Sequence, residues 1–466
     1  MRLFNRYYSG YHVLLPVVDL LMAVLVSVIS WYLLDSREVS RGTFWLNYIS
    51  QGFIVGVLVV MVFYYSDLYS IDDTLPGRDW AVRLFSGFGI TCLLLGALSH
   101  VIPRPAMRDI SFTAMLWIGV GLFLWRIEFI SLLRQRKVNG KLLIVGKQSI
   151  GKLIAEEMHR RKHLGMEVVG FIAHKPGRIA LSYGNPVRIS VPVFAHHSTI
   201  EVVESKQVSK ILVEGPESCV DFPAQDLVML RLRGVPIQNC HDFYERVLGK
   251  IPITDLQPGW IVLSEGFSRS RLIFFLKRVI DIVVSLLGLI LSAPVALIAA
   301  IAIKLDSAGP VFYSQERVGQ NERVFKLYKF RSMSCDAESG SGPVWAAKND
   351  PRITRVGRVL RKLRIDEIPQ MVNVLMGEMS FVGPRPERPY FVAKLKEKIP
   401  FYHLRFTLKP GITGWAQISY SYGDSEEDAV EKLQYDLYYV KNISPLFDLQ
   451  IIFETLKTVL LRRGAQ

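Results

Sequence analysis

Long apolar segments dominate the first 130 residues of the chain. Four of them occur, near residues 13–34, 48–65, 81–102 and 112–130. The hydrocarbon core of a bilayer needs about 20 apolar residues at a helical rise of about 1.5 Å each, and these segments reach or approach that length. We therefore predict four transmembrane helices within residues 1–135. The first segment does not fit a signal peptide, because its apolar run is too long and no small-residue cleavage site follows.

Basic residues at the outer ends of this region predict its orientation. Arg2 and Arg6 precede the first segment, and a basic cluster surrounds the end of the fourth: Arg126, Arg134, Arg136, Lys137 and Lys141. By the positive-inside rule, both ends of the region are expected in the cytoplasm. The loop between the second and third segments carries acids as well as arginines and supports this only weakly.

Alternating strand and helix patterns follow over residues 139–250. "KLLIVGKQSIGKLIAEEMHRR" (141–161) has the pattern of a buried strand, a glycine turn and a helix, and further apolar strands are predicted at 166–173, 189–195 and 209–215. This alternation predicts a Rossmann-like domain with a parallel sheet. Its first turn departs from the GxGxxG fingerprint, because Gln148 replaces the middle glycine. We therefore expect a structural or regulatory domain without a redox cofactor; whether it binds a nucleotide stays open.

A fifth apolar segment, residues 279–306, follows a predicted linker at 251–270. Pro294 lies in its middle, two residues after Ser292. A proline inside a helix removes a hydrogen bond and clashes with the preceding turn, at a cost of about 3 kcal/mol. Basic residues also flank both ends, Lys277 and Arg278 before it and Lys304 after it. A helix that breaks at Ser292–Pro294 and leaves the membrane on the side of entry explains both features; a kinked span is the alternative.

The segment 352–364 has six basic residues and no acid. Arg352, Arg355, Arg358 and Arg361 recur every third residue, with apolar residues among them. This pattern predicts a basic amphipathic helix suited to an anionic membrane surface, although a solvated charged face would show the same spacing.

Two adjacent carboxylates, Asp366 and Glu367, come directly after this basic segment. Neighbouring side chains on a helix point about 100° apart, so the pair is poorly placed to share a proton. Two separate roles are expected, one as nucleophile or base and one as metal ligand, and a structural salt-bridge network is the alternative. Pro369 predicts a helix beginning near Asp366, whose N-terminal amides would face a bound phosphate.

Several side chains outside this pair are candidate substrate-binding residues. Arg385 lies between prolines in "GPRP", and Lys329 and Arg331 lie in "YKFRS". Arginine can contact phosphate in a bidentate manner. Arg361 of the basic segment and Gln417 of "LKPGITGWAQ" complete the predicted set.

Charge and cysteine content narrow the range of functions. The net charge of +14 favours an anionic partner: nucleic acid, anionic lipid or a phosphorylated substrate. The four cysteines are scattered and form no CxxC, which argues against a disulfide scaffold or a zinc site and fits a reducing compartment: Cys92, Cys219, Cys240 and Cys335.

The segments "KRVIDI", "GPVFYSQERVG", "FKLYKFRSM", "RIDEIPQMVNVLMGEMSFVGPRP" and "LKPGITGWAQ", in this order, closely resemble the bacterial sugar transferase family, the monotopic-type phosphoglycosyl transferases. The whole chain resembles the long members, which are exopolysaccharide polyprenyl-phosphate hexose-1-phosphate transferases. The fold class this implies is membrane α plus α/β. It comprises four transmembrane helices, a Rossmann-like domain, and a mainly helical catalytic domain at 271–466 anchored by a re-entrant helix at 279–304.

The resemblance also implies roles for individual residues. Asp366 would be the nucleophile, Glu367 would help to hold Mg²⁺ with Asp366, and Arg385 would bind phosphate. The helix would break at Ser292–Pro294 and stay re-entrant. These roles imply an enzyme at the cytoplasmic face of the bacterial inner membrane, acting at the first membrane step of exopolysaccharide, O-antigen or capsule synthesis.

The substrates implied are a nucleotide diphosphate sugar, with UDP-hexose as the default, and undecaprenyl phosphate. The parallel sheet and the four helices are expected to stabilise a homodimer or to sense a nucleotide. The sequence does not define the sugar.

Three other functions are compatible with parts of the pattern. A membrane-bound nucleotide-sugar dehydratase or epimerase needs an intact dinucleotide turn and a nearby Tyr-x-x-x-Lys pair, but the pair here, Tyr390 and Lys394, lies beyond the re-entrant helix. A non-enzymatic scaffold of polysaccharide assembly would not need Asp366, Glu367 and Arg385 together. Nucleic-acid binding is disfavoured, because nothing resembles a recognition helix outside the membrane-proximal region.

Overall fold

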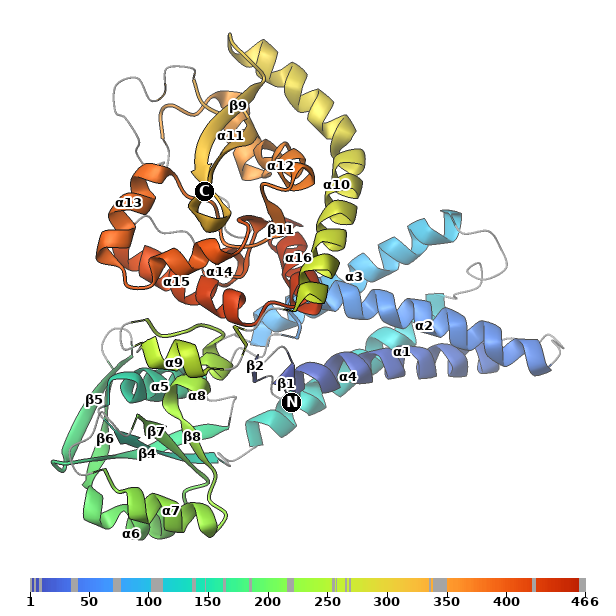
Figure 1. Cartoon of the computed structure of the whole chain (residues 1–466). Coiled ribbons are helices and arrows are strands. Elements are labelled where there is room, and N and C mark those ends of the chain that lie inside the picture. The colour runs from blue at the N-terminus through green and yellow to red at the C-terminus, as the bar shows by residue number, and fades with distance from the viewer. Residues whose placement is uncertain are drawn as a thin grey trace. The chain divides into compact units, whose positions relative to one another are not determined.

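The computed structural model of the chain divides into two compact units (Figure 1). The first comprises residues 1–3 and 7–243, and the second comprises residues 4–6 and 244–466. The structure describes the chain apart from residues 1, 4–5, 8–10, 35–40, 70–76, 102–111, 136–139, 147, 162–164, 184–186, 216–221, 254–255, 257, 265, 268–269, 335–336, 338–349, 421–424 and 461–466. Cys219, Cys335, Arg136 and Lys137 therefore lie outside the described residues.

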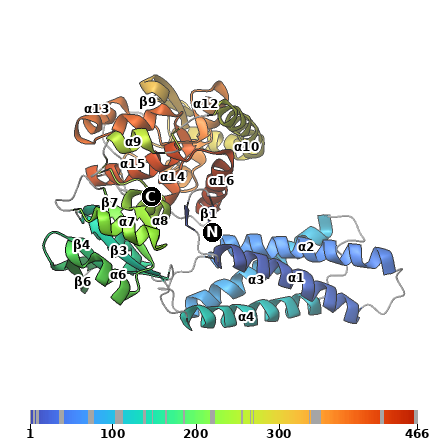
Figure 2. The ribbon, with the colours of Figure 1, turned by 60° about the horizontal axis from the view of Figure 1, so that its bottom comes forward.

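Four long helices form the N-terminal part of the first unit, where the four apolar segments predict them. They are α1 (Tyr11–Leu34), α2 (Arg41–Tyr65), α3 (Gly77–Val101) and α4 (Phe112–Gln135). Helix α1 packs against α2 and α4, as Figures 1 and 2 both show, and α3 packs against α2. Their shared core includes Leu15, Val59, Phe63, Ile118 and Leu122.

Length and hydropathy single out one membrane-spanning candidate among the described residues. It is α10 (Arg271–Asp306), and only 11% of its most apolar window is buried in the protein. The apolar stretches of α1, α2 and α3 are shorter, at Leu14–Val26, Gly52–Tyr65 and Val82–Ala97. Four transmembrane spans therefore stay a prediction.

A buried charge cluster joins three parts of the helical region. Arg126 of α4 pairs with Asp19 of α1, and its Nη1 donates to the carbonyl oxygen of Leu68 at 2.7 Å. The Tyr69 hydroxyl donates to Asp19 Oδ2 at 2.8 Å. Arg126 is therefore a structural cation neutralised within the bundle, and it contributes nothing to the basic cluster that predicts the orientation.

A six-stranded sheet forms the rest of the first unit. The order is β5-β6-β4-β3-β7-β8, parallel except where β5 pairs with β6. The predicted parallel sheet is confirmed, and β5 and β8 are two strands that the sequence pattern missed. The strands are β3 (Gly140–Gly146), β4 (Met166–Ala173), β5 (Gly177–Tyr183), β6 (Val187–Ala195), β7 (Lys210–Glu214) and β8 (Ile237–Asn239). The helices are α5 (Ser149–Arg160), α6 (Thr199–Lys206) and α7 (Ala224–Leu232), and the division between the units falls within α8 (Cys240–Leu248).

The second unit is mainly helical, with two small sheets. Strands β9 (Phe312–Val318) and β10 (Val324–Phe330) form an antiparallel hairpin, and β11 (Ser380–Val382) pairs in parallel with β12 (Gly411–Thr413). Its helices, besides α10, are α9 (Pro258–Leu263), α11 (Arg355–Lys362), α12 (Gln370–Met376), α13 (Pro389–Lys398), α14 (Trp415–Ser419), α15 (Glu426–Lys441) and α16 (Pro445–Leu460).

Residues 251–270, the predicted linker, pack into the second unit. Ile251, Ile253 and Leu256 are buried in its main core, and the indole Nε1 of Trp415 donates to the carbonyl oxygen of Gly249 at 2.7 Å. The structural division falls between residues 243 and 244, ahead of the predicted linker. The segment therefore contributes to the core of the domain that follows it.

Helix α10 is continuous through Pro294. The interruption expected at Ser292–Pro294 is absent; instead the helix bends along its length (Figure 1). A proline removes one backbone hydrogen bond of a helix, while the residues before and after it can keep theirs. A proline can therefore bend a long helix without unwinding it. The Ser292 hydroxyl lies 3.4 Å from the carbonyl oxygen of Leu289 and bonds within the turn.

Charged residues near the start of α10 tie it to the rest of the second unit. Lys277 is buried and donates to the carbonyl oxygen of Val382 at 2.8 Å and to Asp448 at 2.9 Å. Asp281 accepts from the Phe381 amide at 2.8 Å. Lys277 therefore fixes α10 to β11, a role that its place beside an apolar segment does not predict.

Candidate active site

The two adjacent carboxylates lie on a single 3₁₀ turn, η5 (Ile365–Glu367), between α11 and α12. The Thr354 side chain caps α11 by accepting from the Gly357 amide at 2.9 Å. A Cβ atom at residue 357 would lie 2.0 Å from the carbonyl oxygen of Ser332, so only glycine permits this close packing of α11. Arg364 has a positive φ of 55°, which turns the chain from α11 into η5.

The predicted helix start near Asp366 takes the form of two short pieces. The 3₁₀ turn ends at Glu367, and α12 begins at Gln370, directly after Pro369. Both carboxylates therefore precede the α-helix, at its N-terminal side.

Glu367 is the centre of a cluster of cations. Its Oε1 accepts from Arg385 Nη2 at 2.9 Å and from Lys329 Nζ at 3.3 Å. Arg364 Nη1 lies 3.6 Å from Oε2. Burial alone would raise the pKa of Glu367, but these cations outweigh it and hold that pKa below its ordinary value. Glu367 is therefore an ionised, acceptor-only group.

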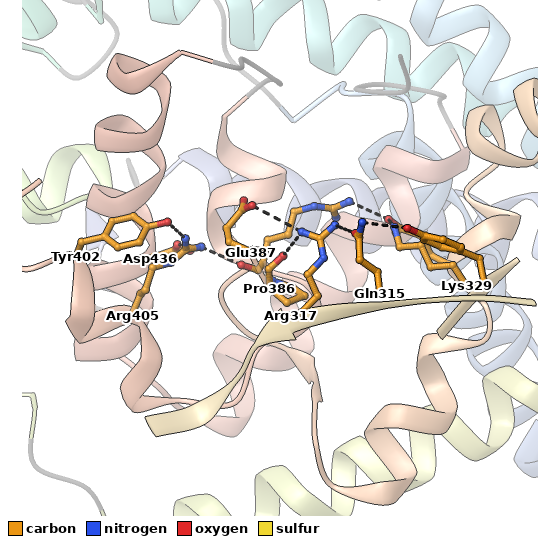
Figure 3. Close-up of polar contacts among 11 residues, drawn as sticks. Gln315, Arg317, Lys329, Pro386, Glu387, Tyr402, Arg405 and Asp436 are labelled. Carbon is orange, nitrogen blue, oxygen red and sulfur yellow. Dashed lines mark hydrogen bonds and ion pairs between the residues drawn. The ribbon is translucent and has the colours of Figure 1, made fainter. Parts of the chain in front are cut away.

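Arg385 links this cluster to α14. Its Nη1 donates to Gln417 Oε1 at 3.0 Å while its Nη2 holds Glu367. The structure thus brings together four predicted residues from separate elements: Lys329 from β10, Glu367 from η5, Arg385 from the loop after β11, and Gln417 from α14. Part of this network is drawn in Figure 3.

Asp366 differs from its neighbour in its electrostatic surroundings. It is buried, and burial raises the pKa of its carboxyl above the ordinary value. The charges of Lys329 and Arg361 oppose that increase, whereas the charge of Glu367 adds to it. Within the described part of the chain no hydrogen bond engages its carboxylate. Asp366 is therefore the less tightly held of the two carboxylates.

Lys329 is a cation held in a poorly solvated place. Burial lowers the pKa of its amine, and the charges of Glu367 and Asp366 partly restore it. Its ammonium group lies 3.3 Å from Glu367 Oε1, and the charges of Asp366 and Arg385 also act on it. A phosphate in this position would meet positive charge on two sides.

Arg331 does not join this cluster. Its side chain is buried and donates to carbonyl oxygens at the C-terminal end of α10: Ala308 at 2.6 Å and Ser307 at 2.8 Å. These contacts cap α10 and leave the guanidinium away from the carboxylates. Substrate binding by Arg331 therefore stays a prediction, and the contacts that the structure shows for it are structural.

Arg361 lies on α11, and its charge acts on Asp366. The predicted basic helix at 352–364 is observed as a shorter α-helix, Arg355–Lys362. Arg352 lies outside it and pairs with Asp350 instead. The membrane-facing role of this helix stays a prediction.

Magnesium binding by the two carboxylates stays a prediction. Among the described residues no three His, Cys, Asp or Glu side chains come close enough to form a metal site of their own. Mg²⁺ is usually held by one or two carboxylates, with water and substrate phosphates completing the octahedron. Asp366 and Glu367 supply that number of acidic ligands.

The glycine turn of the parallel-sheet domain is filled by a side chain of the protein. Glu214, at the end of β7, accepts hydrogen bonds from the backbone amides of Gln148 at 2.7 Å and Ile150 at 2.8 Å. A Cβ atom at Gly146 would lie 2.6 Å from that of Glu214. In dinucleotide-binding folds the pyrophosphate binds at this helix N-terminus. Here a carboxylate takes its place.

Two buried residues next to the site have no counterpart in the sequence prediction. Arg405 and Asp436 form an ion pair, with Nη2 and Oδ2 2.8 Å apart (Figure 3), and Arg405 also donates to the carbonyl oxygen of Arg385. Arg405 lies among apolar residues in "HLRFTLKP". A charged residue between apolar neighbours is a signal of burial, but it does not reveal the partner.

Comparisons with known proteins identify the family of the chain. Residues 272–462 match the model of the family "Bacterial sugar transferase". The chain is 32% identical over 335 residues to the UDP-glucose:undecaprenyl-phosphate glucose-1-phosphate transferase of Escherichia coli (strain K12), covering 69% of this chain and 68% of that protein. The chain belongs to the bacterial sugar transferase family.

Two further relatives show how far the similarity extends. The UDP-N-acetylgalactosamine-undecaprenyl-phosphate N-acetylgalactosaminephosphotransferase of Aeromonas hydrophila is 40% identical over 240 residues, 52% of this chain and 56% of that protein. The undecaprenyl-phosphate glucose phosphotransferase of Komagataeibacter xylinus is 33% identical over 349 residues, 71% of this chain and 61% of that protein. The matched segments thus cover less than two thirds of either relative.

Proposed function

We propose that this protein transfers a sugar 1-phosphate from a nucleotide diphosphate sugar to undecaprenyl phosphate. The observation that carries the proposal is the arrangement at η5. The carboxylate of Asp366 is buried and accepts no hydrogen bond from the described residues, and it lies beside a second carboxylate that is held by Arg385 and Lys329. This arrangement suits an anionic nucleophile that attacks an anionic phosphate.

The transfer proceeds in two displacements. In the first, an Asp366 oxygen attacks the phosphorus that bears the sugar; the Asp–phosphorus bond forms and the nucleoside monophosphate leaves with the electron pair. In the second, an oxygen of the lipid phosphate attacks the same phosphorus, and the bond to Asp366 breaks and restores the carboxylate. Because the two substrates react in turn, the water-soluble donor and the lipid acceptor need not be bound together.

The side chains around Asp366 neutralise the charge that gathers during each displacement. Arg385 and Lys329 supply donors that are already positioned, so they do not reorganise at the moment of reaction. Mg²⁺, held by Glu367 and Asp366, would supply further charge neutralisation on the substrate phosphates. Gln417 keeps Arg385 oriented, because it accepts from the second terminal nitrogen of the guanidinium.

The membrane context follows from the long helices. We propose that α10 enters the cytoplasmic leaflet, bends at Pro294 and leaves on the same side, and that the basic α11 lies at the lipid surface. Helices α1 to α4 would then span the inner membrane. The donor would be a UDP-hexose, the product would begin an exopolysaccharide, O-antigen or capsule unit, and the protein would act as a homodimer.

The test is release of nucleoside monophosphate by purified protein in detergent or lipid. UDP-glucose, UDP-galactose and UDP-N-acetylgalactosamine are each supplied with Mg²⁺ and undecaprenyl phosphate. We expect UMP from at least one donor, together with a lipid-linked sugar diphosphate. The proposal is wrong if no UDP- or other nucleotide sugar yields a nucleoside monophosphate while the protein is folded.

A further inference from the structure

The loop that carries Arg385 is held through its carbonyl groups. Pro384 and Pro386 flank Arg385 and have no amide hydrogen to donate. The four carbonyl oxygens of Pro384 to Glu387 accept hydrogen bonds from four groups on other elements. The donors are the Gly411 amide at 2.9 Å, Arg405 Nη2 at 3.0 Å, Arg317 Nη1 at 3.1 Å and the Val318 amide at 2.9 Å.

Arg405 is the donor that holds the carbonyl of Arg385 itself. It lies in η6 (Tyr402–Thr407), with 6% of the residue exposed. Its Nη1 donates to the Tyr402 hydroxyl at 2.6 Å, and its Nη2 lies 2.8 Å from Asp436 Oδ2 on α15. Figure 3 shows Tyr402, Arg405 and Asp436 grouped on one side of the Pro386–Glu387 segment. Within the described residues, Arg385 O is the hydrogen-bond acceptor that Arg405 contacts outside this group.

Folding stability alone does not account for this ion pair. Aromatic rings pack around it, with the ring centroids of Tyr402 and Phe406 5.1 and 5.8 Å from the guanidinium carbon, and the charge of Glu387 also acts on the guanidinium. Burying two charges costs several kcal/mol for each ion, and well-packed apolar residues in their place are often neutral or stabilising. What apolar residues cannot supply is a donor for the carbonyl of Arg385.

We propose that Arg405, oriented by Asp436 and Tyr402, is a positioning residue for the phosphate site. It fixes the main chain of Arg385, so that the guanidinium of Arg385 reaches Glu367 and Gln417 together. The expected effect on catalysis rests on the proposed function. The claim that Arg405 holds the main chain of Arg385 rests on the contacts alone. A displacement of about 1 Å of a group that contacts the reacting phosphate can cost about 100-fold in rate.

A double-mutant cycle separates positioning from general destabilisation. The variants are Arg405→Gln, Arg385→Ala and the double variant, each assayed for kcat and KM of nucleoside monophosphate release. We expect Arg405→Gln to lower kcat by about 10- to 100-fold with KM changed less than about 3-fold. In the Arg385→Ala background the same change should cost less than about 3-fold, because there is no guanidinium left to position. Losses that multiply in the double variant would overturn the proposal.

Lys441 offers a matched control on the same helix as Asp436. Lys441 and Glu245 form another buried ion pair, 2.6 Å apart, that does not touch the loop. Lys441→Met should lower the melting temperature, as Arg405→Gln does, yet leave kcat within about 2-fold of wild type when measured well below that temperature. An equal loss of kcat in both variants would assign Arg405 a merely structural role.

Hydrogen exchange tests the loop without any assay of activity. The amides of Gly411 and Val318 donate to the loop carbonyls and report whether the loop is held. In the full-length protein, Arg405→Gln should speed exchange at both amides, and Lys441→Met should not. If Arg405→Gln does not fold, Arg405→Lys keeps the charge and should show the same effect to a smaller degree. Unchanged exchange in Arg405→Gln refutes the positioning role. If the wild type is inactive but exchange at these amides is faster in Arg405→Gln, only the proposed function is refuted.

Discussion

Asp366 and Glu367 are neighbours in the chain, yet the protein treats their carboxyl groups in opposite ways. Glu367 is surrounded by Arg385, Lys329 and Arg364, which keep it ionised. Burial raises the pKa of Asp366, and no cation in the described part of the chain donates a hydrogen bond to it. A carboxylate without a hydrogen-bonded cation is open to attack a phosphorus, and an ionised carboxylate has the charge that a metal ligand needs. This division matches two separate roles rather than a shared proton.

Removing the charge of Asp366 tests the nucleophile. Asp366→Asn keeps the shape of the side chain, and we expect turnover to fall by about 10³-fold or more with no change in folding. Nucleoside monophosphate release and circular dichroism measure the two properties. Retention of full activity would contradict the mechanism.

Removing the charge of Glu367 tests the metal ligand and gives a different pattern. Glu367→Gln should also lower activity severely, because Arg385 and Lys329 lose their anionic partner. Part of the loss should return as Mg²⁺ is raised, since a weakened site fills at higher metal concentration. Asp366→Asn is the control and should not recover. A Glu367→Gln enzyme that ignores Mg²⁺ would assign Glu367 a purely structural role.

The pH dependence of the first displacement reports on Asp366. Because the folded pKa lies above the ordinary value of 3.8, the nucleophile is protonated at a higher pH than a solvated aspartate. We expect kcat/KM to fall as pH decreases through a value above about 4. Glu367 should not contribute, because its pKa lies below the ordinary value. If kcat/KM falls only below pH 4, in protein that circular dichroism shows to be folded, the raised pKa of Asp366 is contradicted.

At the level of single residues, residue type and motif identified several side chains that come together in the structure. Lys329, Glu367, Arg385 and Gln417 do come together. Arg331 does not, because β10 ends at Phe330 and the chain turns toward the end of α10. Arg405 and Asp436 were not predicted, since their pairing depends on the packing of η6 against α15, which a one-dimensional pattern does not reveal.

Elements were predicted where their periodicity is strong. The four N-terminal helices and the parallel sheet appear where hydrophobic patterns place them. Strand β5 was missed because it is an edge strand with many exposed positions. A break in α10 was expected because the energetic cost of Pro294 was considered without the hydrogen bonds of the helical residues on either side. The basic helix α11 is shorter than its pattern, since Thr354 caps it after Arg352.

Pro294 is the element-scale test of the membrane anchor. Pro294→Leu restores the missing hydrogen bond and straightens α10, so we expect it to favour a full span. A cysteine-free background carries one introduced cysteine at Gln207 or Gln466. In the parent both should react with an impermeant label only from the cytoplasm, and in Pro294→Leu the C-terminal cysteine should become accessible from outside. External labelling in the parent would contradict the re-entrant arrangement and the proposed cytoplasmic site.

Glu214 is the corresponding test of the parallel-sheet domain. Glu214→Gln removes the charged acceptor of the Gln148 and Ile150 amides, which we expect to lower the free energy of unfolding by about 1–3 kcal/mol. Pyrophosphate should then raise the melting temperature of the variant, because an external anion can replace the carboxylate at the start of α5. Wild type is the control, and a wild-type response of equal size would contradict an occupied turn.

At the scale of the whole molecule, the division into units changes where the catalytic domain begins. Every predicted chemical group lies within 271–466, and the family match covers 272–462. The core of that unit nevertheless includes Ile251 and Ile253, and Glu245 of α8 neutralises Lys441. A change in composition marks where the chain becomes polar. It does not show with which domain the residues before and after that point pack.

Two fragments distinguish these boundaries. Residues 240–466 begin with α8 and should fold cooperatively and release nucleoside monophosphate in detergent, because the complete core and all site residues are present. Residues 271–466 lack the partner of Lys441, and an unpaired buried charge costs about 3–5 kcal/mol. We expect this shorter fragment to keep the chemistry with a clearly lower melting temperature.

The sign of one substitution then decides between the two accounts of this boundary. In 240–466, Lys441→Met strands the Glu245 carboxylate in the core and should lower the melting temperature. In 271–466, where Glu245 is missing, the same substitution removes an unpaired buried cation and should raise it. Thermal unfolding of the four proteins measures this reversal. The same sign in both fragments would mean that residues 240–270 act as a linker, and that Lys441 finds another partner once they are removed.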